Sequence, residues 1–133
     1  MSEQNSNLLL NGDFTERDRH WGVPSPDTAK FENGYCLVQA GAECYQIIHA
    51  TEGKYRLTLK MKADPHFICK AWVLLAPSFT LISLEPFSGN EWSVQYLDFE
   101  APADNTLITV KLGSDYRQPH FGAYFDDVRL ERR

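Results

Sequence analysis

Strict alternation of apolar and polar residues over residues 54–62 is the feature that most constrains the fold of this chain. In this segment, KYRLTLKMK, every second residue from Tyr55 to Met61 is apolar, and the residues between them are Arg, Thr or Lys. A period of two places successive side chains on opposite faces of an extended strand. The segment therefore predicts a strand with one buried face and one solvated face.

Short segments of the same character recur along the chain, separated by turn-forming residues. Pro24 and Pro26 argue against a helix in the loop over residues 15–33. Regularly spaced short strands predict an all-β fold, an antiparallel β-sandwich or barrel. Without a repeat or a linker, we expect one domain over residues 1–133, with residues 1–6 disordered. The further expected strands cover residues 7–14, 35–39, 43–50, 67–75, 79–84, 92–100, 106–112 and 122–131.

The charge of the chain excludes two classes of partner. It has 13 Lys and Arg against 18 Asp and Glu, a formal net charge of −5. An acidic surface repels phosphate backbones and anionic lipid headgroups. We therefore expect neither nucleic acid nor a membrane as the partner.

Cysteine usage and the N-terminal sequence bear on the compartment. Cys36, Cys44 and Cys69 are odd in number, which favours buried free thiols, with one disulfide and one free thiol as the alternative. The N-terminal sequence MSEQNSN resembles no signal peptide. We expect a cytoplasmic protein as encoded, with non-classical export as the alternative.

The sequence carries no motif of a known catalytic centre, so we expect a protein that is not an enzyme. The adjacent Asp126 and Asp127 fall on one expected strand, where neighbouring side chains point to opposite faces, so they cannot flank one bond as acid and base. Asp126 shares the parity of the apolar Val128 and Leu130, which predicts that it points inward. An inward carboxylate needs a partner: a cation, an arginine or backbone amides.

Three motifs together resemble carbohydrate-binding modules of families four and nine. They are NLLLNGDF with the following Trp21, then GKYRLTL with KAD, and YFDDVRL at the end; Trp92 before Phe99 also fits. The resemblance implies a galactose-binding-domain-like jelly roll of two antiparallel sheets. It also implies a structural Ca²⁺ where the first and last strands meet, at the positions of Asp13 and Asp126. Thr15 departs from the pattern, which often has Glu there.

The resemblance further implies glycan binding across the concave sheet or in loops at one end. Strand parity puts Cys69, Ala71 and Val73 in the core and Trp72 with Lys70 outside, so Trp72 is the expected stacking platform. Trp21 and Trp92 are expected to be packing residues. The other expected ligand-binding residues are Gln46 and Tyr96 near Trp72, and Tyr116 and Arg117 at a loop tip.

The expected function is therefore a non-catalytic carbohydrate-binding module or lectin-like domain with a glycan or oligosaccharide partner. The alternative is a protein-interaction or assembly domain that keeps the jelly roll, has lost sugar binding and binds a protein partner.

Overall fold

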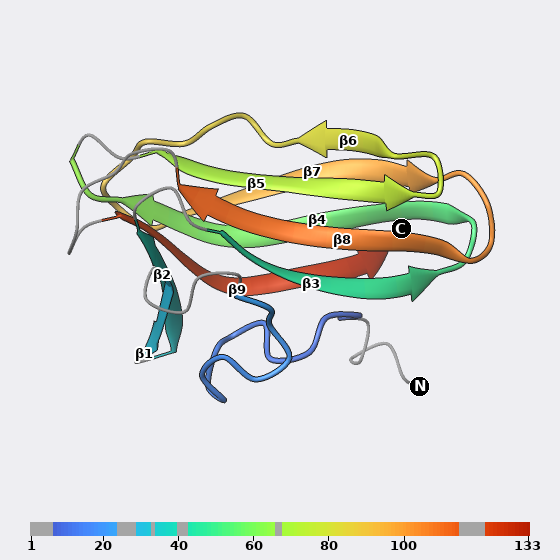
Figure 1. The fold of residues 1–133 in the computed structure, drawn as a ribbon. Helices are drawn as coiled ribbons and strands as arrows, with labels where there is room; N and C mark the ends of the chain where they lie inside the picture. Colours follow the sequence, from blue (N-terminus) through green and yellow to red (C-terminus); the bar gives the residue numbers. More distant parts are fainter. Residues whose placement is uncertain (1–6, 24–28, 33, 40–42, 66–67, 115–121) are drawn as a thin grey trace.

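The computed structural model describes residues 7–23, 29–32, 34–39, 43–65, 68–114 and 122–133. All regular secondary structure in these residues is β-strand (Figure 1). The strands are β1 (Ala29–Glu32), β2 (Tyr35–Gln39), β3 (Glu43–Ala50), β4 (Gly53–Ala63), β5 (Cys69–Ala76), β6 (Thr80–Ser83), β7 (Ser93–Ala101), β8 (Thr106–Ser114) and β9 (Gly122–Arg132).

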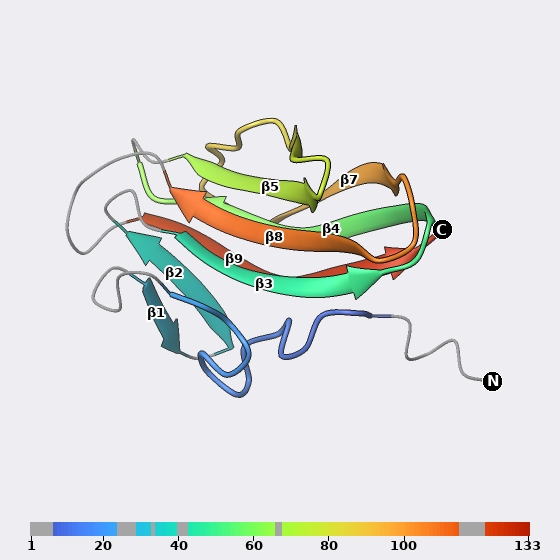
Figure 2. The same cartoon turned by 45° about the vertical axis from the view of Figure 1, so that its right-hand side comes forward.

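The strands form two antiparallel sheets that lie face to face, as two layers in Figure 2. One sheet has five strands in the order β1-β2-β9-β4-β7, and the other has four in the order β3-β8-β5-β6. Sequence neighbours often belong to different sheets, so the chain crosses repeatedly between the layers. The expected all-β antiparallel sandwich is confirmed.

The core lies between the two sheets and follows the alternation of the sequence. Tyr55, Leu57, Leu59 and Met61 of β4 are all buried, as the pattern over residues 54–62 predicts. The three cysteines are buried free thiols, which confirms the first expectation for them. Cys36 of β2 and Cys44 of β3 bring their Sγ atoms to 3.7 Å of each other from opposite sheets. Burial raises the pKa of Cys69 to about 12.

The segment over residues 7–14 is not the strand expected from its apolar residues. It is an irregular run of bends and turns, with Asn11 and Phe14 at positive φ. The segment nevertheless lies along β9: Leu8 N–H donates to Leu130 O (2.8 Å), and Val128 N–H donates to Gly12 O (2.8 Å). Because β2 pairs only with residues 122–125 of β9, the N-terminal segment occupies the edge that β2 leaves open.

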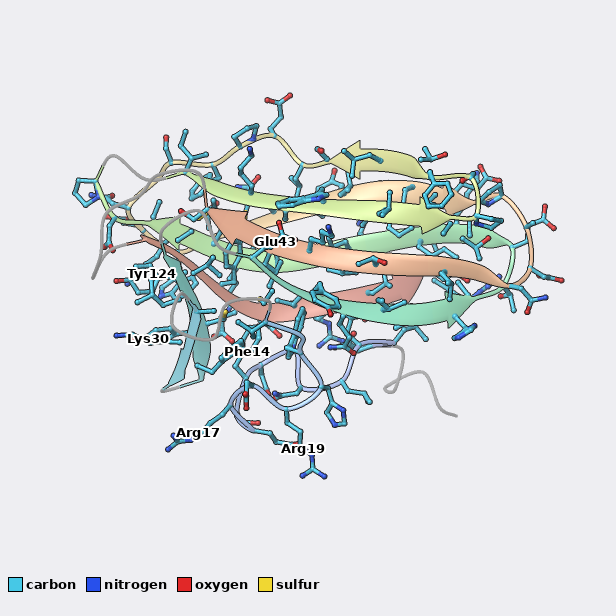
Figure 3. The ribbon with its side chains drawn as sticks, in the orientation of Figure 1. Phe14, Arg17, Arg19, Lys30, Glu43 and Tyr124 are labelled. Carbon is cyan, nitrogen blue, oxygen red and sulfur yellow. The ribbon has the colours of Figure 1, made fainter. Side chains whose placement is uncertain are left out.

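The N-terminal segment also adds a side layer to the core. Leu9, Phe14 and Trp21 are buried, and the ring centroids of Phe14 and Trp21 are 5.3 Å apart. Figure 3 shows Phe14 turned toward the sandwich, while Arg17 and Arg19 project away from it. The range 15–33, expected as a loop, contains the short strand β1 at its end.

Candidate functional site

A groove beside Trp72 is the best candidate for a ligand site. Trp72 lies on β5 and alternates with the buried Cys69, Ala71 and Val73, so its side chain leaves the core and is half-buried on the outer face of the four-stranded sheet. The expected face of Trp72 is therefore confirmed, and Lys70 shares it. The groove measures about 410 Å³, within the range of small-ligand sites. It is lined by Lys70, Ala71, Trp72, Leu81, Ser83, Leu84 and Pro86.

Backbone hydrogen bonds hold the wall of this groove opposite Trp72. After β6, Leu84 N–H donates to Ala71 O (2.9 Å). Cys69 and Phe87 then exchange two bonds, of 2.7 and 3.1 Å. The chain after β6 thus stays attached to β5, and the groove is formed before any ligand arrives.

Polar groups flank the indole of Trp72. In the sheet register, Trp72 stands directly between Ser83 of β6 and Lys111 of β8. The Lys111 ammonium lies 3.3 Å from a carboxylate oxygen of Glu43. An apolar ring beside a hydroxyl and ammonium groups can hold a ligand that has both C–H and hydroxyl surfaces. Ser83 and Leu81 were missed from the sequence, because only the pairing of β6 with β5 brings them to the groove.

Gln46 does not join this groove, which corrects the expectation. It is a buried residue of β3, opposite the buried Val110, and therefore faces the other side of the sheet from Trp72. Its side-chain oxygen accepts from Leu10 N–H (2.8 Å), and its side-chain nitrogen donates to Leu10 O (3.0 Å). Its amide thus fixes the N-terminal segment to β3 and is not available to a ligand.

Tyr96 does not lie near Trp72 either. It is exposed as expected, but β7 is the outermost strand of the five-stranded sheet, so Tyr96 is on the opposite side of the sandwich. The guanidinium of Arg56 lies 4.2 Å from the centroid of its ring. Alternation predicted its outward direction correctly but could not predict its sheet.

The other two tryptophans, both expected to be packing residues, differ in burial. Trp21 is buried and its indole N–H donates to Asn11 O (3.0 Å), which confirms a packing role. Trp92 is not a core residue, because 41% of its surface is exposed. Tyr116 and Arg117 lie outside the described residues, as do residues 1–6.

Asp126 points outward, not inward as its parity predicted. The register of β4 with β9 shifts between Thr58 and Lys60, and Asp127 has a φ of +50°, so a bulge at Asp127 inserts one extra residue. Asp126 therefore faces outward beside its cross-strand partner Lys60, while Val128 returns to the core. Burial raises the pKa of Asp126.

The N-terminal turn forms a polar hollow of about 330 Å³ with the bulge, and it was the expected place for Ca²⁺. Asp13, Glu16 and Asp127 line this hollow, together with Arg129. Asp13 Oδ1 already accepts from the N–H and hydroxyl of Thr15, which lowers the pKa of Asp13. No three His, Cys, Asp or Glu side chains of the described residues are grouped to hold one ion.

Comparison with known proteins shows which solved structures share this fold. No known family model and no curated protein sequence matches the chain. Among solved structures, a family 61 carbohydrate-binding module in complex with β-1,4-galactotriose matches with a TM-score of 0.71 and 15% identity, over 96% of this chain and 99% of that one. The chain has the fold of a carbohydrate-binding module.

Other modules agree with this match. A structure of family 4 matches with a TM-score of 0.63 and 16% identity, over 94% of this chain and 99% of that one. The CBM22-1 xylan-binding domain from Paenibacillus barcinonensis Xyn10C matches with a TM-score of 0.60 and 10% identity, over 96% and 95%. At these identities the likeness establishes the fold, and the resemblance in the sequence motifs is confirmed at that level.

Proposed function

We propose that this chain is a non-catalytic carbohydrate-binding module, and that the groove beside Trp72 holds the glycan. The observation that carries the proposal is a half-buried indole that lines a preformed groove, with hydroxyl and ammonium groups beside it. The fold shared with modules of families 4, 22 and 61 supports the same ligand class. The described residues contain no helix long and apolar enough to cross a membrane.

The chemistry of the groove suits a pyranose ring. One face of a pyranose carries C–H groups that stack on an aromatic ring, and its rim carries hydroxyls that exchange hydrogen bonds. Trp72 offers the ring, Leu81 extends the apolar surface, and Ser83 offers a hydroxyl that can both donate and accept. The ligand is held by stacking and hydrogen bonds, and no described side chain there is placed to break a glycosidic bond.

Replacing Trp72 by alanine tests this proposal. We expect the loss of the platform to weaken glycan binding by about 1–3 kcal/mol, roughly a five- to 150-fold rise in Kd. Isothermal titration with β-1,4-galactotriose, xylohexaose and cellohexaose measures it. Melting temperature should change little, because a side chain on the outer face leaves no internal cavity.

The matched control for Trp72 is Leu74→Ala, on the same face of β5 but outside the groove. This variant should keep the affinity of the native protein. If Trp72→Ala and Leu74→Ala bind every sugar equally well, the groove is not the glycan site. If the native protein binds none of the three sugars, the proposal is wrong for neutral β-linked glycans.

A structural Ca²⁺ remains a separate prediction, which rests on the resemblance alone. The expected ligands are Asp13 and Asp126, and the carboxylates that line the N-terminal hollow are Asp13, Glu16 and Asp127. An ion that binds only the folded state stabilises it by mass action, so EDTA should lower the melting temperature and added Ca²⁺ should restore it. Identical melting curves with EDTA and with Ca²⁺ reject the ion.

A further inference from the structure

A row of exposed apolar side chains lies on the face of the sandwich opposite the Trp72 groove. Trp92, Val94 and Tyr96 are 41%, 61% and 56% exposed. Their alternate positions place all three on the outer face of the edge strand β7 or directly before it. Contiguous exposed apolar side chains on a protein of this size mark interaction sites more often than chance.

Beside this row the surface is hollowed. Val94, Lys60 and Asp126 are successive cross-strand partners on β7, β4 and β9. With Trp92 they line a hollow of about 320 Å³, at the lower end of the range for small-ligand sites. The hollow therefore has an aromatic side, an apolar side and two charged groups.

The indole of Trp92 packs against two neighbouring side chains on the same face, Lys62 and Tyr124. The Lys62 ammonium lies 5.2 Å from the Trp92 ring centroid and 5.0 Å from that of Tyr124. Trp92 and Tyr124 meet edge to face, with centroids 6.5 Å apart. A ring held in this way loses little conformational freedom when a ligand stacks on it.

The two charged groups of the hollow have unused hydrogen-bonding capacity. Among the described residues, the Lys60 ammonium makes no hydrogen bond, and its charge acts on Asp126 without a direct ion pair. Asp126 Oδ1 accepts from the N–H of Asp127 (2.7 Å). No described residue donates a hydrogen bond to the other carboxylate oxygen, Oδ2. One donor group and one acceptor group thus face a hollow beside an aromatic ring.

We propose that this hollow is a second saccharide site, which takes one pyranose unit of a neutral glycan. The C–H face of the sugar stacks on Trp92 and contacts Val94. One hydroxyl donates to Asp126, and its neighbour accepts from Lys60. A cation and an anion side by side favour a neutral ligand with paired donors and acceptors over a charged one.

The second site rests on the proposed function only for its ligand class. The hollow beside Trp92 shares no lining residue with the groove beside Trp72, because the two sites lie on opposite outer faces of the sandwich. A chain with both sites could contact two glycan strands, or two parts of one strand, at once. Two linked sites raise the overall avidity for a repetitive ligand without any new contact.

The three tryptophans provide a test in one spectrum. In ¹⁵N-labelled protein each indole N–H gives a separate signal, which Trp→Phe variants assign to Trp21, Trp72 and Trp92. We expect titration with β-1,4-galactotriose, xylohexaose or cellohexaose to shift the Trp92 signal and the Trp72 signal with separate Kd values. Trp21 is buried and bonded to Asn11, so its signal is the internal control.

Each outcome bears on one of the two sites. A shift of Trp72 alone overturns the second site and leaves the proposed function intact. A shift of Trp92 alone overturns the groove, and no shift of either signal overturns both. If the Trp92 signal instead moves with protein concentration in the absence of sugar, this face binds a second copy of the chain and the saccharide proposal is wrong.

Side-chain variants then separate the polar contacts from general surface effects. Asp126→Asn and Lys60→Met should each raise the Kd reported by Trp92 by about fivefold or more and leave the Kd reported by Trp72 unchanged. Lys54→Met is the matched control, since it removes the same charge from the same face of β4 outside the hollow. Equal Kd values for Lys60→Met and Lys54→Met would overturn the assigned contacts.

Discussion

Trp21→Ala is expected to destabilise the fold by about 3–5 kcal/mol, the loss typical of deleting a large buried aromatic side chain. The indole is 6% exposed, packs on Phe14 and donates its N–H to Asn11 O. Its removal leaves a cavity and takes one of two donors from Asn11 O, which keeps only the bond from Phe14 N–H (3.3 Å). Urea denaturation of the native and variant proteins measures the difference in the free energy of unfolding.

The same substitution at Trp92 serves as the control for Trp21. Because Trp92 lies on the outer face and is 41% exposed, Trp92→Ala should cost less than about 1 kcal/mol. Trp21 is not among the described residues that line the Trp72 groove or the Trp92 hollow, so Trp21→Ala at a temperature where it remains folded should bind glycans as the native protein does. Equal stability of the two variants would show that the N-terminal segment does not pack as described.

Gly12→Ala is expected to destabilise the fold by about 3 kcal/mol, at the upper end for overpacking a filled site. A Cβ at position 12 would lie 2.0 Å from the backbone oxygen of Val128, so the N-terminal segment must move away from β9. That movement breaks the bond from Val128 N–H to Gly12 O and weakens the one from Asn7 to Val128 O. Thermal and urea denaturation both report the loss.

Gly89→Ala is the matched control for Gly12. A Cβ there would also be too close to a neighbour, but that neighbour is the end of the Phe87 side chain, which can turn aside. We expect a loss below about 1 kcal/mol for this variant. Similar losses at the two glycines would mean that the contact between the Gly12 turn and β9 is not a tight one.

Alternation predicted those elements whose structure depends on local pattern alone. The buried and solvated faces of the strand over residues 54–62 were predicted correctly, because all of its apolar side chains pack into the same core. The pairing of β4 with β9 is regular up to Thr58. The outward direction of Trp72 follows from the small and β-branched residues that alternate with it. The regular spacing of such short alternating segments was likewise enough to predict the class of fold.

Parity failed for Asp126 because it assumes an unbroken strand. The bulge at Asp127 shifts the phase of β9 by one residue between Phe125 and Val128, so two carboxylates follow each other without either entering the core. A bulge of this kind arises from pairing with β4, and its positive φ falls on a residue that is not glycine. The apolar Phe125 and Val128 have opposite parity, which an unbroken strand could not bury together, and this is the trace that the bulge leaves in the sequence YFDDV.

By itself the sequence determined the class of fold, the buried face of β4 and the exposed face of Trp72, since these depend on the side-chain period of an extended chain. Only the tertiary structure decided which residues share a site. Gln46 and Tyr96 were expected beside Trp72, yet Gln46 bonds a residue 36 positions away and Tyr96 belongs to the other sheet. Alternation sets the face of a residue within its strand, but strand order and register set its neighbours, and both arise from contacts between distant segments.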